Sequence, residues 1–119
     1  YSENVIETND HASRCKLAAV NLGYYDDPYI KFMISKSIDR SSPEVNRGYA
    51  LRVIFLRNFI ENFIKFHDKE CQIISLGCGF DTLYWHLERS NNLPNYGLIE
   101  IDFASVIYHK AKIIIRNQK

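Results

Sequence analysis

The sequence predicts an α/β fold in which helices cover a parallel β-sheet, and two observations in its second half support this prediction. The apolar, β-branched run 71–76 ends at a glycine turn and is followed by helical periodicity over 81–89. A second apolar run, 96–101, ends at an acidic residue and precedes a helical pattern over 103–116. Strands that alternate with helices in this way usually lie parallel and are joined by crossovers. We therefore expect the two runs to form adjacent parallel strands, the first of them buried, with the helix 81–89 crossing between them.

Two short helices are predicted in the first third of the chain. Helix-start residues at 8–10 precede a helical pattern over 12–22, which Gly23 ends. The segment 23–28 has the composition of a turn, and one or two further helical turns are expected over 29–34.

A long helix is predicted between Ser42 and about Phe66. Ser42 is a good N-cap residue, Pro43 suits the first helical position, and Glu44 places an acidic group in the first turn. Apolar side chains then recur at steps of three and four residues and define one face: Val45, Tyr49, Val53, Leu56, Ile60 and Phe63. We expect this face to pack against the rest of the chain.

Composition and charge exclude several classes of protein. The net charge of +1 is too close to zero for a dedicated nucleic-acid-binding domain, and no apolar run approaches the roughly 18 residues that span a bilayer. The three cysteines lack CxxC spacing and the four histidines lie far apart, which predicts neither a disulfide framework nor a metal site. Free cysteines are typical of a reducing compartment, and we expect a cytoplasmic protein.

The turn between the first predicted strand and its helix has the composition of a nucleotide-binding loop. Gly77 and Gly79 allow a close approach of backbone to ligand, and Asp102, after the next strand, can accept hydrogen bonds from ribose hydroxyls. A dehydrogenase fingerprint would need a third glycine where Thr82 stands, and no P-loop run is present. The pattern favours a nucleoside ligand without a pyrophosphate, such as S-adenosylmethionine. Another nucleotide ligand and a purely structural turn stay open as alternatives.

Five further segments stand out, in this order: 8–16 (TNDHASRCK), 23–30 (GYYDDPYI), 43–52 (PEVNRGYALR), 71–87 (CQIISLGCGFDTLYWHL) and 100–103 (EIDF). Together they resemble the leucine carboxyl methyltransferase family across nearly the whole chain. The resemblance implies a Rossmann-like, S-adenosylmethionine-dependent methyltransferase fold. It also implies methyl transfer to the α-carboxylate of the C-terminal leucine of the protein phosphatase 2A catalytic subunit, which would be the partner.

The resemblance further implies four cofactor-binding residues. Lys16 and Arg52 look like the cations that hold the methionine carboxylate of S-adenosylmethionine, and a guanidinium suits this role because it can bind a carboxylate at two points. Gly77 looks like the turn residue beneath the cofactor, and Asp102 like the acceptor for its ribose hydroxyls. Without the resemblance, Lys16 and Arg52 would be interpreted as solvated helix charges.

No catalytic residue is predicted, because a leucine carboxylate is already ionised at neutral pH and needs no general base. Arg47 ranks below the four cofactor-binding residues, as an arginine that could support Arg52 or face the substrate. Asp81 is expected to cap the helix that follows the glycine turn, with the ordering of a water near the cofactor as the alternative. Cys78 is interpreted as a small residue that fits the turn.

The chain is interpreted as two parts. Residues 1–68 form a helical segment that packs on the sheet, and residues 69–119 form the first half of the cofactor-binding α/β domain. Such a sheet has about five to seven strands, so two strands indicate an incomplete fold, made of the first βαβα unit plus N-terminal helices. We expect the apolar faces left by absent strands to favour self-association, and the chain alone to be inactive.

Two alternatives to this function stay open. A tRNA wybutosine-synthesis carboxyl methyltransferase shares the N-terminal motifs, and a truncated, non-catalytic module for binding or interaction would need no substrate pocket. The residue sequences of segments 23–30 and 43–52 resemble more closely the enzyme that acts on the phosphatase. No nucleic-acid or membrane partner is expected in this interpretation.

Overall fold

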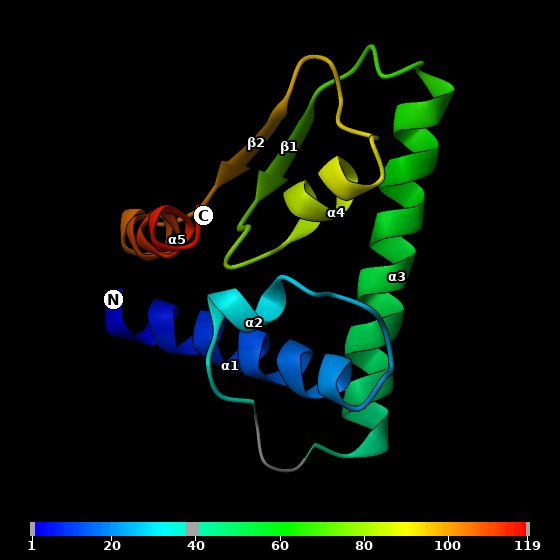
Figure 1. Ribbon diagram of the computed structural model, residues 1–119. Helices are drawn as coiled ribbons and strands as arrows, with labels where there is room; N and C mark the ends of the chain where they lie inside the picture. The colour runs from blue at the N-terminus through cyan, green and yellow to red at the C-terminus, as the bar shows by residue number, and fades with distance from the viewer. Residues whose placement is uncertain (1, 38–40, 119) are drawn as a thin grey trace.

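The computed structural model describes residues 2–37 and 41–118. Its elements follow in this order: α1 (Ser2–Asn21), α2 (Ile30–Met33), α3 (Pro43–Phe66), β1 (Ile73–Leu76), α4 (Leu83–Arg89), β2 (Leu98–Ile101) and α5 (Ala104–Arg116). Figure 1 shows α4 between the strand pair and α3, while α1 packs near the N-terminal half of α3. Within the described residues, no helix is both long and apolar enough to cross a membrane.

The two strands lie side by side and parallel, with Ile73 paired with Leu98 and Leu76 with Ile101. Helix α4 lies in the chain between them, which confirms the predicted crossover. Both strands begin two residues later than predicted. The reason is visible in β2, because Gly97 has a φ of +89°, outside the extended region, and the regular ladder begins only after it.

Helix α1 begins well before the predicted start near Thr8, so the predicted N-terminus of this helix was wrong. Thr8 lies inside the helix, where its hydroxyl donates to the carbonyl of Asn4 at 2.8 Å instead of capping a free N–H. The predicted end is confirmed: Gly23 has a φ of +81°, and the Tyr24 amide donates to the Ala19 carbonyl at 3.0 Å. This left-handed ending is of the Schellman type and satisfies carbonyls of the last turn.

Helix α3 begins as predicted. Pro43 is its first residue, and the Ser42 hydroxyl accepts a hydrogen bond from the Val45 amide at 3.3 Å. This cap satisfies one of the N–H groups that the first turn of a helix leaves free. Helix α2 likewise falls within the helical turns predicted over 29–34.

The buried face of α3 differs from the predicted one. Val45, Leu56 and Phe63 are 42%, 45% and 40% exposed, and the other three predicted positions are only half-buried. Asn46 and Ala50 are buried instead, on the side where α1 packs. Ala50 joins a cluster with residues at the end of α1, where its small side chain permits close approach of the two helices. Contact with α1 therefore determines which face of α3 is buried.

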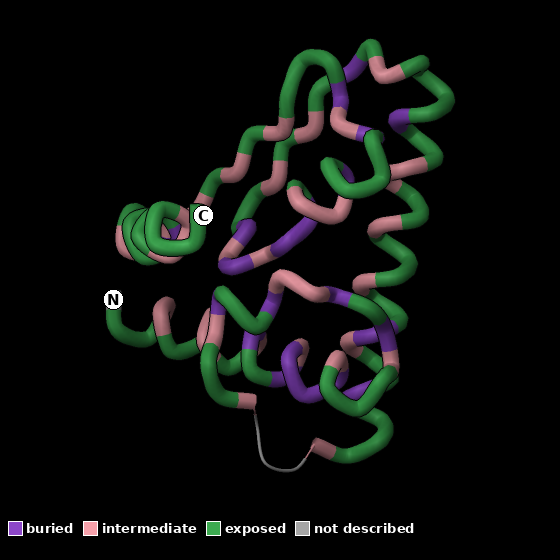
Figure 2. The backbone as a smooth tube through the Cα atoms, in the orientation of Figure 1, coloured by how far each residue is buried: buried purple, intermediate pink, exposed green. Residues whose placement is uncertain are grey.

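Besides the small cluster around Ala50, two larger apolar clusters form the core, and Figure 2 shows buried residues concentrated around α1, α2 and the turn after β1. The first cluster joins α1, α2, α5 and that turn: Leu17, Ile30, Met33, Phe80 and Val106. The second joins the C-terminal end of α3 to α4 and the segment before β1: Ile64, Cys71, Leu83 and Leu87. Phe80 belongs to the first and Leu83 to the second, so the segment after the glycine turn is held from two sides.

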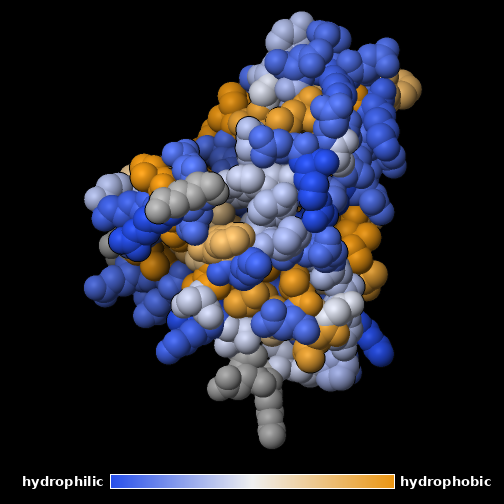
Figure 3. All heavy atoms as spheres, in the orientation of Figure 1, coloured by the Kyte–Doolittle hydropathy of each residue, from blue (hydrophilic) through white to orange (hydrophobic). Residues whose placement is uncertain are grey.

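The described residues cover one face of the strand pair, so the prediction that 71–76 is a buried strand was wrong. Successive side chains of a strand point to opposite faces of the sheet. Ile73 and Leu98 pack against the second cluster, whereas Ile74 and Leu76 are 55% and 77% exposed. Figure 3 shows apolar surface over the strands and beside α3.

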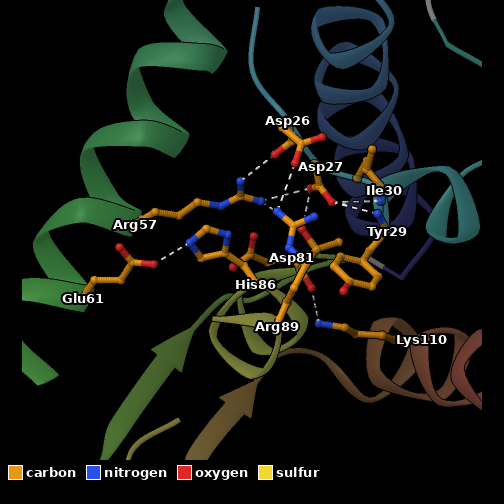
Figure 4. Close-up of polar contacts among 11 residues, drawn as sticks. Asp26, Asp27, Tyr29, Ile30, Arg57, Glu61, Asp81, His86, Arg89 and Lys110 are labelled. Atoms are coloured by element: carbon orange, nitrogen blue, oxygen red, sulfur yellow. Dashed lines mark hydrogen bonds and ion pairs between the residues drawn. The ribbon is translucent and has the colours of Figure 1, made fainter. Parts of the chain in front are cut away.

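A buried carboxylate, that of Asp27, joins three helices (Figure 4). Its Oδ1 accepts hydrogen bonds from the amides of Tyr29 and Ile30 at 3.0 and 3.2 Å, at the start of α2. Its Oδ2 accepts from the Thr82 hydroxyl at 2.5 Å and from Arg57 Nη2 at 3.2 Å. We call these five residues the Asp27 cluster, and it ties α2, α3 and the start of α4 together.

Polar contacts extend this cluster along α3 and α4. Arg57 Nη1 donates to the Asp26 carbonyl at 2.9 Å, and Arg89 pairs with the Asp26 carboxylate at 3.0 Å. His86 Nε2 lies 2.7 Å from Glu61 Oε1. Side chains from α3 and α4 thus meet at several points beside the turn.

Removal of the Asp27 carboxylate is expected to destabilise the fold strongly. The Asp27→Ala substitution should lower the free energy of unfolding by about 3–5 kcal/mol, because the buried Arg57 charge and the Thr82 hydroxyl lose their partner. Urea denaturation followed by far-ultraviolet circular dichroism measures this change.

Asp26→Ala is the matched control for this prediction. The Asp26 carboxylate is 77% exposed, and surface ion pairs contribute little to stability. The denaturation midpoint should therefore move only slightly. An equal loss of stability in both variants would contradict the role given to the Asp27 cluster.

Candidate functional site

A cavity of about 700 Å³ lies among α1, α3 and the carboxyl ends of the two strands. All four predicted cofactor-binding residues line it: Lys16 of α1, Arg52 of α3, Gly77 after β1 and Asp102 after β2. Parallel strands bring their carboxyl ends to one edge of the sheet, and the α1–α3 contact places the two cations beside that edge. The fold therefore gathers positions that lie far apart in the sequence.

The cavity has a cationic side and an acidic side. Lys16 and Arg52 come from helices and, within the described residues, form neither an ion pair nor a hydrogen bond. Asp81 follows the glycine turn after β1, and Asp102 directly follows β2. Arg57 also lines the cavity, but its charge is already paired with a carboxylate. A complementary ligand has an anionic group that binds the two cations, Lys16 and Arg52. It also has hydrogen-bond donors or a positive charge that bind the two acids, Asp81 and Asp102.

The glycine turn has the backbone shape that its sequence predicts. Gly77 and Gly79 have φ values of +65° and +53°, in the left-handed region. Other residues pay about 1–2 kcal/mol to adopt this region, which explains glycine at both positions. The Gly77 amide donates to the Ile101 carbonyl at 2.7 Å, so the end of β2 fixes the turn.

Asn9 of α1 braces the turn, although no site role was predicted for it. Its Oδ1 accepts a hydrogen bond from the Phe80 amide at 3.0 Å, and a Cβ on Gly79 would lie 2.5 Å from the same oxygen. Its Nδ2 is buried without a hydrogen-bond partner among the described residues. Its position could have been a signal, because Asn9 lies seven residues before Lys16 and this spacing places both on one helix face.

The Asp102 carboxylate is held in place by two backbone amides. Its Oδ2 accepts from the Gly79 amide and its Oδ1 from the Phe103 amide, both at 2.7 Å. Each carboxylate oxygen can accept more than one hydrogen bond, so both retain capacity for a ligand hydroxyl. Asp102 thus links the glycine turn to the residue that precedes α5.

One secondary prediction differs from the structure, and another stays a prediction. Asp81 was expected to cap the helix after the turn, but α4 begins at Leu83 with Thr82 as its N-cap and no side-chain capping bond. The Thr82 hydroxyl is instead committed to the Asp27 cluster. Arg47 is exposed and does not line the cavity, and its role toward Arg52 or the substrate stays a prediction.

Cys78 sits inside the turn with only 7% of its surface exposed. Burial raises the pKa of the Cys78 thiol to about 11, so the thiol is neutral at physiological pH and is a poor nucleophile. Over residues 2–37 and 41–118, no three His, Cys, Asp or Glu side chains form a group that could hold a metal ion.

The parallel strand pair, the left-handed glycine turn and the strand-end acid define an α/β protein with a ligand-sized cavity at the carboxyl ends of its strands. Sequence comparison then identifies the family. The leucine carboxyl methyltransferase profile matches residues 4–119. The chain belongs to the leucine carboxyl methyltransferase family, which confirms the resemblance seen in the five segments.

Individual relatives agree with this assignment. Leucine carboxyl methyltransferase 1 of Rattus norvegicus is 39% identical over 94% of this chain and 33% of the relative. The protein of the same name in Caenorhabditis elegans is 36% identical over 95% of this chain and 35% of the relative. tRNA wybutosine-synthesizing protein 4 of Homo sapiens is 31% identical over 92% of this chain and 17% of the relative. The chain spans about a third of the length of the first of these relatives.

Substitution of Gly79 is expected to disturb the contact between α1 and the turn. Gly77→Ala should cost about 1–2 kcal/mol, because Gly77 has open space around it and only the left-handed backbone opposes a side chain. Gly79→Ala should cost more, since its Cβ would also collide with Asn9. Thermal and urea denaturation of both variants measure the difference.

The double variant Asn9→Ala/Gly79→Ala isolates the collision. Without the Asn9 side chain, the Cβ at position 79 meets no obstacle. The double variant should therefore lose no more free energy of unfolding than Asn9→Ala and Gly77→Ala lose when their two losses are added. If Gly79→Ala and Gly77→Ala were equally stable, α1 would not press on the turn.

Proposed function

We propose that this chain forms the S-adenosylmethionine-binding part of an enzyme that methylates the α-carboxylate of a C-terminal leucine. The proposed acceptor is the C-terminus of the protein phosphatase 2A catalytic subunit. The observation that supports this proposal most directly is the cavity itself, which is lined by Asp102 and by Lys16 and Arg52, two cations without an ion-pair partner in the described part of the chain, in a member of this family.

The residues of the cavity fit the chemical groups of S-adenosylmethionine. Lys16 and Arg52 would hold its methionine carboxylate, since they are cations without protein partners among the described residues. Asp102 would accept the ribose hydroxyls, and the amides of Gly79 and Phe103 keep its carboxylate in position. Gly77 leaves open space beside the turn, because nothing lies within 4 Å of where its Cβ would be.

When bound, S-adenosylmethionine supplies an electrophilic methyl group on a sulfonium. The leucine carboxylate forms an O–C bond to this methyl as the C–S bond breaks, which yields a methyl ester and S-adenosylhomocysteine. The carboxylate is ionised at neutral pH, so no residue of this chain has to remove a proton. The contribution of Lys16, Arg52 and Asp102 is to bind and orient, which lowers the barrier by fixing the reacting groups in line.

A tRNA-modifying role is the second candidate, and sequence identity supports it to a lesser degree. The proteins named tRNA wybutosine-synthesizing protein 4 are 31% and 34% identical to this chain in Homo sapiens and Saccharomyces cerevisiae. The animal proteins named leucine carboxyl methyltransferase 1 are 36–40% identical, although the Schizosaccharomyces pombe one is only 31% identical. The protein acceptor is therefore our first choice.

Arg52→Lys should weaken binding of S-adenosylhomocysteine by about tenfold, because the charge remains but the two-point contact with a carboxylate is lost. Adenosine, which has no carboxylate, should bind the wild type and the variant alike. Isothermal titration calorimetry of this chain measures both ligands.

Arg47→Lys is the matched control, since Arg47 lies exposed on the same helix outside the cavity. It should leave both affinities unchanged. Equal loss of both ligands in Arg52→Lys would indicate a damaged fold, and no loss of either would remove Arg52 from the site. Failure of the wild-type chain to bind S-adenosylhomocysteine would contradict the proposed function.

Methyl transfer can be tested in a chimera in which this chain replaces the matching segment of the Rattus norvegicus relative. The chimera is expected to form a base-labile methyl ester on a peptide that ends in leucine, and none on the same peptide with a C-terminal amide. This chain alone should bind ligand without forming ester. A folded chimera that binds S-adenosylhomocysteine but methylates only tRNA would favour the second candidate.

A further inference from the structure

We propose that Asp81 binds the α-ammonium group of the amino-acid part of the ligand. This inference rests on the proposed function, because it assumes that the cavity holds S-adenosylmethionine or S-adenosylhomocysteine. It adds a specific anionic partner for a group that the other residues of the cavity leave without one.

Asp81 has a fixed backbone, and its side chain has no polar partner within residues 2–37 and 41–118. Its amide donates to the Cys78 carbonyl at 3.0 Å, and its carbonyl accepts from Lys110 Nζ at 2.8 Å (Figure 4). Its side chain is half-buried at the cavity wall, and its carboxylate accepts no hydrogen bond from the described residues. A half-buried carboxylate on a rigid turn, without a cap to form, is available to a cationic ligand.

The nearby cations are already paired with other carboxylates. Lys110 is 3% exposed, and its Nζ lies 2.6 Å from Glu100 Oε2. Arg57 lies 3.2 Å from Asp27 Oδ2. The charge of Asp81 therefore has no close counter-ion within the described part of the chain, and partly buried charges are costly unless they are paired.

The two acids of the cavity differ in what they can still accept. Asp102 already receives two backbone amides, which suits a fixed acceptor for ribose hydroxyls. Asp81 receives none and keeps its full acceptor capacity for the three N–H donors of an ammonium group. An α-amino acid carries its ammonium and carboxylate on one carbon, so a cavity that offers Lys16 and Arg52 to the carboxylate needs an acid for the ammonium.

Asp81→Asn tests this assignment with little change of shape. The variant should bind S-adenosylhomocysteine about tenfold more weakly than the wild type, because a charge-assisted contact is lost. Its affinity for 5′-methylthioadenosine, which lacks the whole amino-acid part, should change less than about twofold. Isothermal titration calorimetry of the chain measures both, and Asp26→Asn, outside the cavity, is the matched control.

A third ligand separates the ammonium from the sulfur and the carboxylate. The desamino analogue of S-adenosylhomocysteine should bind wild type and Asp81→Asn equally. Equal loss of all three ligands would show that Asp81 only shapes the turn, and unchanged affinity for S-adenosylhomocysteine would show that it takes no part; either result overturns the inference. If Asp81→Asn leaves the affinity for S-adenosylhomocysteine unchanged while the wild type binds this ligand, the Asp81 inference fails and the proposed function is still supported. Failure of the wild type to bind it would contradict the proposed function itself.

Discussion

The buried carboxylate of Asp27 is the interaction on which the arrangement of this protein depends. A carboxylate removed from water costs several kcal/mol unless it is fully partnered, and Asp27 has four partners, from three parts of the chain. Two of them start α2, Arg57 belongs to α3, and Thr82 immediately precedes α4. Since Arg57 follows Arg52 on one helix, and Thr82 follows the glycine turn, the same cluster fixes the cationic side of the cavity relative to the acidic side.

Polar cross-links have this importance because the apolar core is divided. A small cluster joins the end of α1 to α3; of the two larger clusters, one unites α1, α2, α5 and Phe80, and the other unites α3, α4 and the strands. The cavity lies where the helices meet the strand ends, and its lining includes residues from both clusters, such as Val106 and Leu83. A ligand that bridges Lys16 or Arg52 to Asp102 would add a connection across this division. Ligand binding to the native state is expected to stabilise the fold for that reason.

The exposed apolar surface has two sources. The uncovered side of the strand pair presents Ile74 and Leu76, and the outer side of α3 presents Phe55 and Phe59, which stack on each other with ring centroids 6.4 Å apart. Contiguous exposed apolar faces commonly mark surfaces that contact other protein segments or other protein chains. These faces agree with the expected self-association, which stays a prediction. The division of the chain between residues 68 and 69 also stays a prediction.

The sequence by itself determined the features that depend on local chemistry. Strand, glycine turn, helix and second strand follow from hydrophobic periodicity, and Ser42 and Gly23 mark helix ends because capping involves only neighbouring residues. The family also follows from the sequence, because five segments preserve its motifs in order. The tertiary structure decided the rest, since it depends on contacts between distant residues. It chose the face of α3 that packs on α1, left one side of the sheet uncovered, and committed Thr82 to Asp27. It also brought Lys16, Arg52, Gly77 and Asp102 to one cavity, because only folding sets the distance between a helix near the start of the chain and the end of β2.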